Sequence, residues 1–265
     1  MQAEGPKTIY YRGAYIRDAL TEDWLSSGIV GPKSGDVAIG GCSAGGLTIW
    51  LNIDAFAQQL RTGGVPASSR ITGFADAGFF LDHVTEGGSV YRTQLFQWGY
   101  VAWNSSAALS PACLSAYPAS DKWRCIFAQY TAAHISTPLF MFNSRYDSCQ
   151  LGGCELMLPD PDKPWNQMLP SSQVAAQAYS VDFNNALNAS GFQSLSQHGG
   201  FITSCKVHCD AGDAAWWTTQ APGDKGLGSN TTLALAFDAW LTGKTQGSQS
   251  WYLDLCAIPP CNPVC

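Results

Sequence analysis

The chain has 265 residues, of which 46% are hydrophobic, and this length and apolar content suffice for one buried core. The formal net charge is -6 and the sequence pI is about 5.0, with no cluster of lysine and arginine, which argues against nucleic acid as a partner. No apolar run reaches the roughly 18 residues of a membrane span, so no membrane association is expected. We therefore expect one monomeric domain, residues 1–265.

Apolar periodicity divides the chain into alternating helices and short strands. In chain order the predicted elements are residues 13–27 (helix), 36–39 (strand), 47–60 (helix), 71–75 (strand), 138–143 (strand), 171–189 (helix) and 230–241 (helix). Asn230 is the expected N-cap of the last helix, and Gly243 its C-cap. This alternation predicts the α/β class, with a mostly parallel sheet covered by helices on both faces.

The aromatic-rich residues 92–129 are expected to form an insertion or lid over the carboxyl edge of the sheet. An ordinary helical connection between two strands is the alternative for the same residues. Either way, they separate the second predicted strand from the third.

Residues 41–46, Gly-Cys-Ser-Ala-Gly-Gly, lie between a predicted strand and a predicted helix. A glycine-rich chain shows G-x-S-x-G by chance fairly often, but strand, sharp turn and helix together are typical of a nucleophile elbow. There the serine takes a strained conformation that needs small neighbours, and the next amide faces a developing oxyanion. Ser43 is therefore the candidate nucleophile of an acyl transfer, and Ala44 the oxyanion donor.

A serine nucleophile needs a histidine base and a carboxylate that orients it. The four histidines are His83, His134, His198 and His208. In α/β-hydrolases the order is serine, acid, histidine, with the acid after a late strand. Asp147, directly after the strand at 138–143, and His208 satisfy that order.

Each of these assignments has a rival. Asp147 is alternatively a turn or capping residue, and His208 a surface histidine, with His198 in its polar loop as the main competing base. Asp76 is the competing carboxylate. Because apolar residues follow it, we expect Asp76 to be buried in a wall near the elbow, where it bonds backbone amides.

The cysteine count indicates an oxidising compartment, because an even number this large is unusual for a cytosolic enzyme. The ten cysteines are at positions 42, 113, 125, 149, 154, 205, 209, 256, 261 and 265. A disulfide at Cys205 or Cys209 would hold the loop of His208. A metal site of Cys205, His208 and Cys209, completed by Cys149 and Cys154, is disfavoured because no spacing matches the paired C-x2-C of zinc sites.

Three sequons support the secretory interpretation, and they begin at Asn104, Asn188 and Asn230. The first residues have no apolar signal region, so we expect an export signal upstream of Met1 and a secreted protein of the extracellular space or cell wall. Because the net charge is negative, an acidic polysaccharide would have to be attracted by local basic side chains. The alternative is that these side chains are solvated surface charges with no binding role. The candidate cations are Arg92, Lys122, Arg124 and Arg145.

These motifs together resemble the pectin acetylesterase and Notum family of secreted carboxylesterases. They occur in the family's order as YYRG at 10–13, GCSAGG at 41–46, ADAGFFLD at 75–82, NSRYDSCQL at 143–151, SCKVHC at 204–209 and CAIPPCNPVC at 256–265. The resemblance implies an α/β-hydrolase fold, no metal and no cofactor. It also implies Ser43 as nucleophile, Asp147 as acid and His208 as base.

Family members carry the first sheet strands and a Gly-Gly-Gly-Trp loop upstream of the matched region, so we expect a hydrolase fold that lacks its first strands. The family's activity implies removal of acetyl groups from a pectin-type polysaccharide, which makes an acetylated polysaccharide the expected partner. The alternatives are a Notum-like deacylase, which removes palmitoleate from a signalling protein, and an inactive truncated remnant that binds carbohydrate.

Overall fold

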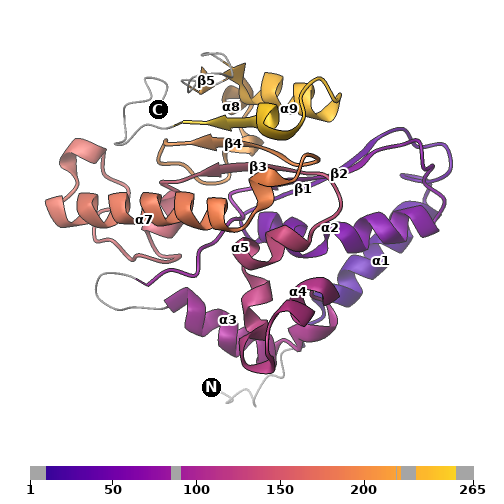
Figure 1. Cartoon of the computed structure of the whole chain (residues 1–265), viewed down its shortest axis with the longest axis horizontal. Coiled ribbons are helices and arrows are strands. Elements are labelled where there is room, and N and C mark those ends of the chain that lie inside the picture. The colour runs from indigo at the N-terminus through magenta and orange to yellow at the C-terminus, as the bar shows by residue number, and fades with distance from the viewer. Residues whose placement is uncertain (1–9, 85–90, 219, 222–230, 255–265) are drawn as a thin grey trace, which may run out of the picture.

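A five-stranded parallel sheet organises the computed structural model, which describes residues 10–84, 91–218, 220–221 and 231–254 (Figure 1). The strand order within these residues is β1-β2-β3-β4-β7, and every neighbouring pair is parallel. The strands are β1 (Val37–Cys42), β2 (Ile71–Asp76), β3 (Leu139–Ser144), β4 (Gly199–Thr203) and β7 (Trp251–Leu253). A short antiparallel pair, β5 (Gln220–Ala221) and β6 (Thr231–Thr232), lies outside this sheet.

Helices connect the parallel strands and cover both faces of the sheet, with α8 and α9 on one side and α2, α5 and α7 on the other (Figure 1). The helices are α1 (Gly13–Ser26), α2 (Ala44–Thr62), α3 (Tyr91–Ala102), α4 (Pro111–Ala116), α5 (Ala128–Thr131), α6 (Ser148–Leu151), α7 (Pro170–Ala189), α8 (Ala214–Thr218) and α9 (Leu233–Leu241). The predicted α/β architecture is confirmed.

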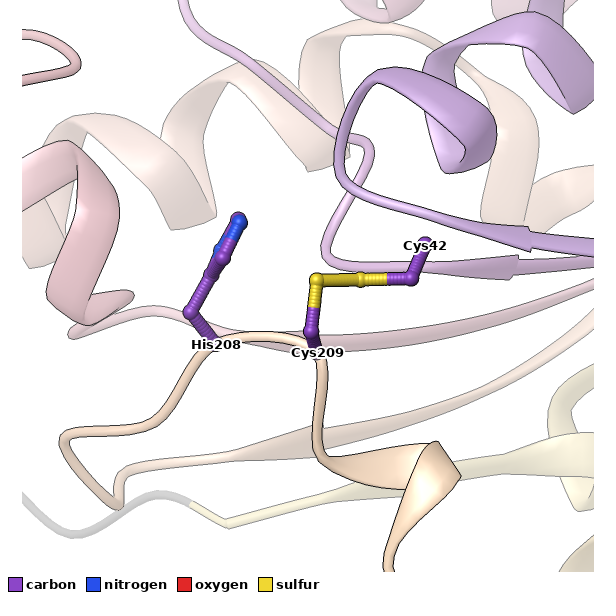
Figure 2. Close-up of side chains that lie close together, drawn as sticks. All are labelled: Cys42, His208 and Cys209. Carbon is purple, nitrogen blue, oxygen red and sulfur yellow. A yellow bond between two sulfur atoms is a disulfide. The ribbon is translucent and has the colours of Figure 1, made fainter.

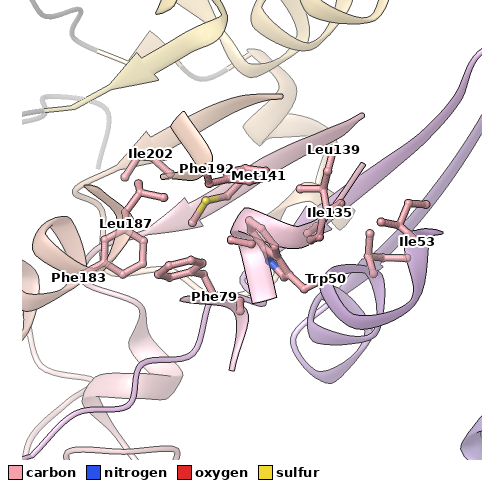
Figure 3. Close-up of a cluster of buried hydrophobic side chains, with 14 of the residues drawn as sticks. Trp50, Ile53, Phe79, Ile135, Leu139, Met141, Phe183, Leu187, Phe192 and Ile202 are labelled. Atoms are coloured by element: carbon pink, nitrogen blue, oxygen red, sulfur yellow. The ribbon is translucent and has the colours of Figure 1, made fainter. Parts of the chain in front are cut away.

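The central strand β3 shows why the sheet needs cover on both faces. All of its side chains are buried. Leu139 and Met141 join the core beneath α2 and α7 (Figure 3), whereas Phe140 and Phe142 join the aromatic core beneath α9. Because successive side chains of a strand point to opposite faces, a continuous apolar run predicts a strand with helices on both sides.

Two predicted elements differ from the structure. The strand expected at 36–39 begins at Val37 and runs on to Cys42. Among the described residues β1 pairs with β2 alone, and Ile39 is the one buried residue of the strand. The last helix begins at Leu233, and its N-cap is Thr232, whose hydroxyl accepts from the N–H of Leu235. Asn230, the expected cap, lies outside the described residues.

The sequence pattern did not predict strands β4 and β7. Gly199 and Gly200 open β4, and a Cβ on Gly200 would lie 2.4 Å from the ring of Trp251. A Cβ on Gly199 would lie 2.8 Å from the ring of Trp240. Close contacts with tryptophans far along the chain therefore require these glycines. Because glycine is depleted in strands, the local sequence did not indicate a strand there.

Residues 92–129 lie between β2 and β3 and include helical turns with a small core of their own, which packs against Leu47 and Leu51 of α2. The Cys113–Cys125 disulfide lies within this core. The segment is therefore inserted beside the helix that follows Ser43. That it closes over the site stays a prediction.

The four candidate cations divide into two groups. Arg145 is 6% exposed and the Arg92 side chain is 11% exposed, so neither is the solvated surface charge that the sequence allowed. Arg92 faces the buried Glu155, with Nε 3.5 Å from Oε2. Lys122 and Arg124 are half-buried. No helix within the described ranges is long and apolar enough to cross a bilayer.

Candidate active site

The candidate residues gather at one edge of the sheet, because all five strands run in the same direction. Ser43 directly follows β1, Asp76 ends β2, and Asp147 lies three residues beyond β3. His208 lies in the loop after β4. Residues that are far apart in the chain thus meet at the carboxyl edge.

The turn at Ser43 has the strained geometry of a nucleophile elbow. Ser43 has φ 56° and ψ -119°, and helix α2 begins at the next residue. A conformation so rarely adopted by residues other than glycine costs about 1–3 kcal/mol and persists only where surrounding contacts enforce it. One such contact is the hydrogen bond from the Ser43 N–H to the carbonyl of Asp76, at 2.9 Å.

Two glycines of the elbow are needed because the backbones approach closely. A Cβ on Gly41 would lie 2.6 Å from the carbonyl of Gly45, and one on Gly46 would lie 2.3 Å from the carbonyl oxygen of Asp76. A Cβ on Gly45 would meet nothing within 4 Å. The steric requirement therefore falls on the first and last glycines of the GCSAGG motif.

Asp147 and His208 form a hydrogen-bonded pair. Nδ1 of His208 lies 2.8 Å from Oδ2 and 3.0 Å from Oδ1 of Asp147, which is fully buried. Asp147 also caps α6 by accepting the N–H of Gln150, so the capping role and the pairing role coexist. Because Nδ1 faces the carboxylate, Nε2 is the nitrogen left for proton exchange.

Burial opposes the charged form of His208, but the hydrogen bond and the negative charge of Asp147 outweigh it and raise its pKa above the usual value. Asp76 and Asp210 add to this rise. Burial raises the pKa of Asp147, and the bond to His208 counteracts that rise. The arrangement thus stabilises a histidine that carries a proton during a reaction.

Asp76 is buried near the elbow, as expected, and bonds a backbone amide there. Its carboxylate accepts the N–H of Ala211 at 3.0 Å, and burial raises its pKa to about 6. Asp76 therefore contacts the elbow through its carbonyl oxygen and the loop beyond His208 through its side chain.

The main rival base is a structural residue. His198 is fully buried at the start of β4, where Nδ1 accepts the N–H of Leu139 at 3.2 Å and the ring stacks on Phe192. Burial lowers its pKa to about 4. It lies at the amino edge of the sheet, opposite Ser43. Residues 195–197 form the expected loop, but His198 at its end turns into the core.

The other two histidines also lie apart from the elbow. His83 is buried between α5 and α7, with Nδ1 3.0 Å from Asp182, and lines a pocket of about 340 Å³ with Gln129. His134 ends a short helical turn just before β3. Neither follows the carboxyl end of a late strand.

A disulfide joins Cys42 to Cys209, the residue before Ser43 to the residue after His208 (Figure 2). Sulfur and nitrogen atoms of Cys42, His208 and Cys209 lie within 4.8 Å of one another. Both sulfurs are used in the disulfide, so they are not thiolate ligands of a metal.

The remaining cysteines of the disfavoured metal set are oxidised too. Cys149 pairs with Cys154, and Cys205 is also in a disulfide. The sequence allowed a disulfide at Cys209 but left its partner open. Only the fold brings Cys42, 167 residues away, to it.

The N-terminus of α2 leaves unpaired backbone N–H groups beside Ser43, where the sequence predicts the oxyanion donor. The N–H of Leu47 bonds to the carbonyl of Ser43, which leaves the N–H groups of Ala44, Gly45 and Gly46 without an acceptor inside the helix. Free amides at a helix N-terminus attract negative charge. The Ala44 amide directly follows Ser43, as the oxyanion role requires.

Comparison with known proteins places this chain in a family. A family model described as Pectinacetylesterase matches residues 1–265. Pectin acetylesterase 11 of Arabidopsis thaliana is 30% identical over 266 residues, and pectin acetylesterase 7 of the same plant is 29% identical over 268 residues. Each alignment covers 97% of this chain and 63% of the relative, so the chain spans under two thirds of their length.

More distant relatives share the fold. The human palmitoleoyl-protein carboxylesterase NOTUM is 24% identical, and the alignment covers 96% of this chain and 50% of that protein. The crystal structure of the Wnt deacylase Notum from Drosophila superposes with a TM-score of 0.75 at 21% identity and covers 100% of this chain and 68% of that one. This likeness confirms the predicted α/β-hydrolase fold, and the family match confirms the resemblance noted in the sequence. The chain therefore belongs to the pectinacetylesterase family.

Proposed function

We propose that this chain carries the active site of a serine carboxylesterase that removes acetyl groups from a pectin-type polysaccharide. The observation that carries the proposal is the hydrogen bond between Asp147 and His208 at the sheet edge that also holds the strained Ser43. Membership in the pectinacetylesterase family supports an acetyl ester as the substrate.

The geometry supports an acyl-enzyme route without a cofactor. Nε2 of His208 takes the proton of the Ser43 hydroxyl while Oγ bonds to the acetyl carbon, and the N–H of Ala44 donates to the developing oxyanion. His208 then returns the proton to the sugar oxygen as the ester bond breaks. A water molecule then attacks the acetyl carbon while it gives a proton to His208. His208 returns this proton to Oγ of Ser43 as the bond between Oγ and the acetyl carbon breaks, and acetic acid leaves.

Features outside the site support a secreted or cell-wall enzyme. The described residues hold three complete disulfides, as expected of an oxidising compartment. Asn104 and Asn188 are exposed and available as glycosylation sites, whereas Asn230 lies outside the described residues. We infer that the protein is a monomer, which analytical ultracentrifugation tests. We also infer that residues 92–129 act as the lid of the site.

Acetate release from acetylated pectin by the full-length protein tests the function. The unaltered protein should release acetate, and Ser43→Ala should remove nearly all of the release. Ser115→Ala, at an exposed serine of α4, is the matched control and should retain full activity. Unchanged release by Ser43→Ala contradicts the proposal.

Two further measurements separate the alternatives. A preference for octanoyl over acetyl esters would indicate a Notum-like deacylase instead. No covalent adduct of a fluorophosphonate on Ser43 in folded protein would indicate an inactive carbohydrate-binding remnant.

A further inference from the structure

The Cys42–Cys209 disulfide links the two segments whose spacing the proposed reaction depends on. Cys42 is the last residue of β1 and precedes Ser43, and Cys209 follows His208. The two Cα atoms lie 5.3 Å apart (Figure 2). No other disulfide between described residues joins the elbow to the His208 loop.

The loop that carries His208 has little regular structure to hold it. After β4 ends at Thr203, the chain is half-buried from residue 206 to 211 and forms only the short turn Asp210–Gly212. Cys209 has φ 67°, in the left-handed region that residues other than glycine seldom adopt. Backbone strain at both Ser43 and Cys209 means that surrounding contacts hold both positions.

A second, non-covalent link runs beside the disulfide. The carbonyl of Asp76 accepts the N–H of Ser43 at 2.9 Å, and its carboxylate accepts the N–H of Ala211 at 3.0 Å. Asp76 therefore supports the same two segments, but through a single hydrogen bond to each. The disulfide is the covalent restraint on the distance between the serine and the histidine.

We propose that the Cys42–Cys209 disulfide is a positioning element that holds His208 within proton-transfer reach of Ser43. The inference rests on the proposed function, since it assigns the disulfide a role in that reaction. A misplacement of about 1 Å can lower a rate about a hundredfold. Loss of the disulfide should therefore lower kcat about a hundredfold and leave KM nearly unchanged.

The test compares two double variants of the full-length protein, Cys42→Ala/Cys209→Ala and Cys113→Ala/Cys125→Ala. The second removes the disulfide of the inserted segment and is the control for loss of one disulfide, since an effect on the proposed lid should change KM and not kcat. Steady-state kinetics on p-nitrophenyl acetate should show the hundredfold fall in kcat only for the first. The Tm and near-UV circular dichroism of each variant establish that it is folded at the assay temperature.

A His208→Ala background separates positioning from general destabilisation. If the disulfide acts through His208, its removal should change the residual rate of His208→Ala less than threefold. An equal fall in both backgrounds contradicts the inference, as does a folded Cys42→Ala/Cys209→Ala variant with nearly full kcat. Absence of a fluorophosphonate adduct on Ser43 of the unaltered protein would instead contradict the proposed function itself.

Should the double variant not fold, partial reduction provides the same test on protein that folds with Cys42 and Cys209 in place. Cys42 and Cys209 are half-buried, whereas Cys113 and Cys125 are fully buried, so a dithiol reaches the first pair sooner. Each dithiol molecule is oxidised to its own disulfide and leaves two protein thiols. Because Cys149–Cys154 is also half-buried, the titration uses a Cys149→Ala/Cys154→Ala variant.

Mass spectrometry measures the opening of each disulfide during this titration, and the fluorophosphonate labelling rate measures the reactivity of Ser43. If the disulfide positions His208, the labelling rate should fall in proportion to the opening of Cys42–Cys209. Labelling that stays constant while this disulfide opens contradicts it.

Discussion

Nδ1 of His208 lies 2.8 Å from Oδ2 of a fully buried Asp147, although the two residues are 61 positions apart in the chain. The carboxylate holds the imidazole in one orientation and leaves Nε2 free to exchange a proton. The negative charge of Asp147 also stabilises the protonated imidazole, whose charge burial disfavours. Asp147 therefore both orients His208 and stabilises its charged form.

Replacement of Asp147 by asparagine tests this pairing. The amide oxygen can still cap α6 at Gln150, but it cannot stabilise a charged His208, so kcat should fall about 10⁴-fold with KM little changed. Steady-state hydrolysis of p-nitrophenyl acetate measures both constants. Asp210→Asn, at a nearby half-buried carboxylate, is the control and should stay within about tenfold. Similar losses in both variants would show that only local charge matters.

The pH profile follows from the raised pKa of His208. The base must be neutral to accept a proton, so kcat/KM should fall as the pH drops through a midpoint above the ordinary 6.5 of histidine. Burial gives Asp76 a pKa of about 6, so it is mostly charged at that midpoint and favours protonated His208. Asp76→Asn keeps an acceptor for Ala211 but removes the charge, and should move the midpoint to lower pH. A midpoint that stays or rises contradicts this account.

The elbow glycines offer a matched pair of variants. Gly46→Ala places a Cβ 2.3 Å from the carbonyl oxygen of Asp76, and overpacking of this kind costs about 1–3 kcal/mol. Gly45→Ala meets nothing within 4 Å and replaces a helical glycine, so it should leave stability equal or raise it by about 0.5–1 kcal/mol. Urea unfolding measures both changes. A Gly45→Ala protein less stable than Gly46→Ala would refute the steric account.

His198 should affect stability and its pH dependence, not the reaction. Its pKa of about 4 lies below the unfolded value, so between pH 6.5 and 4 the unfolded chain binds a proton that the folded chain does not. The free energy of unfolding should therefore fall with falling pH, by up to about 1.4 kcal/mol per pH unit from this group. His198→Leu should reduce that slope.

His198→Leu also leaves the N–H of Leu139 without its acceptor, which should lower the free energy of unfolding by about 1–3 kcal/mol at pH 7. Urea unfolding at pH 7 and 4.5 measures the loss and the slope. Labelling of Ser43 by a fluorophosphonate should continue at nearly the unaltered rate in folded His198→Leu. Loss of labelling there, with retention in His208→Ala, would reverse the assignment of the base.

Features that depend on neighbouring residues could be predicted before the fold was known. The apolar run that forms β3 and the glycines around Ser43 are local patterns, and they predict a buried strand and a sharp turn. The order of Ser43, Asp147 and His208 could be predicted as well, because parallel strands bring their carboxyl ends to one edge.

Contacts between groups that are far apart in the chain could not be predicted from sequence patterns. Sequence spacing does not specify the strand register that brings Cys42 to Cys209, and it does not show that His198 turns into the core while His208 reaches Asp147. Both outcomes follow from burial and from the packing of helices and strands that are far apart in the chain. Those contacts are non-local, so no window of the sequence contains them.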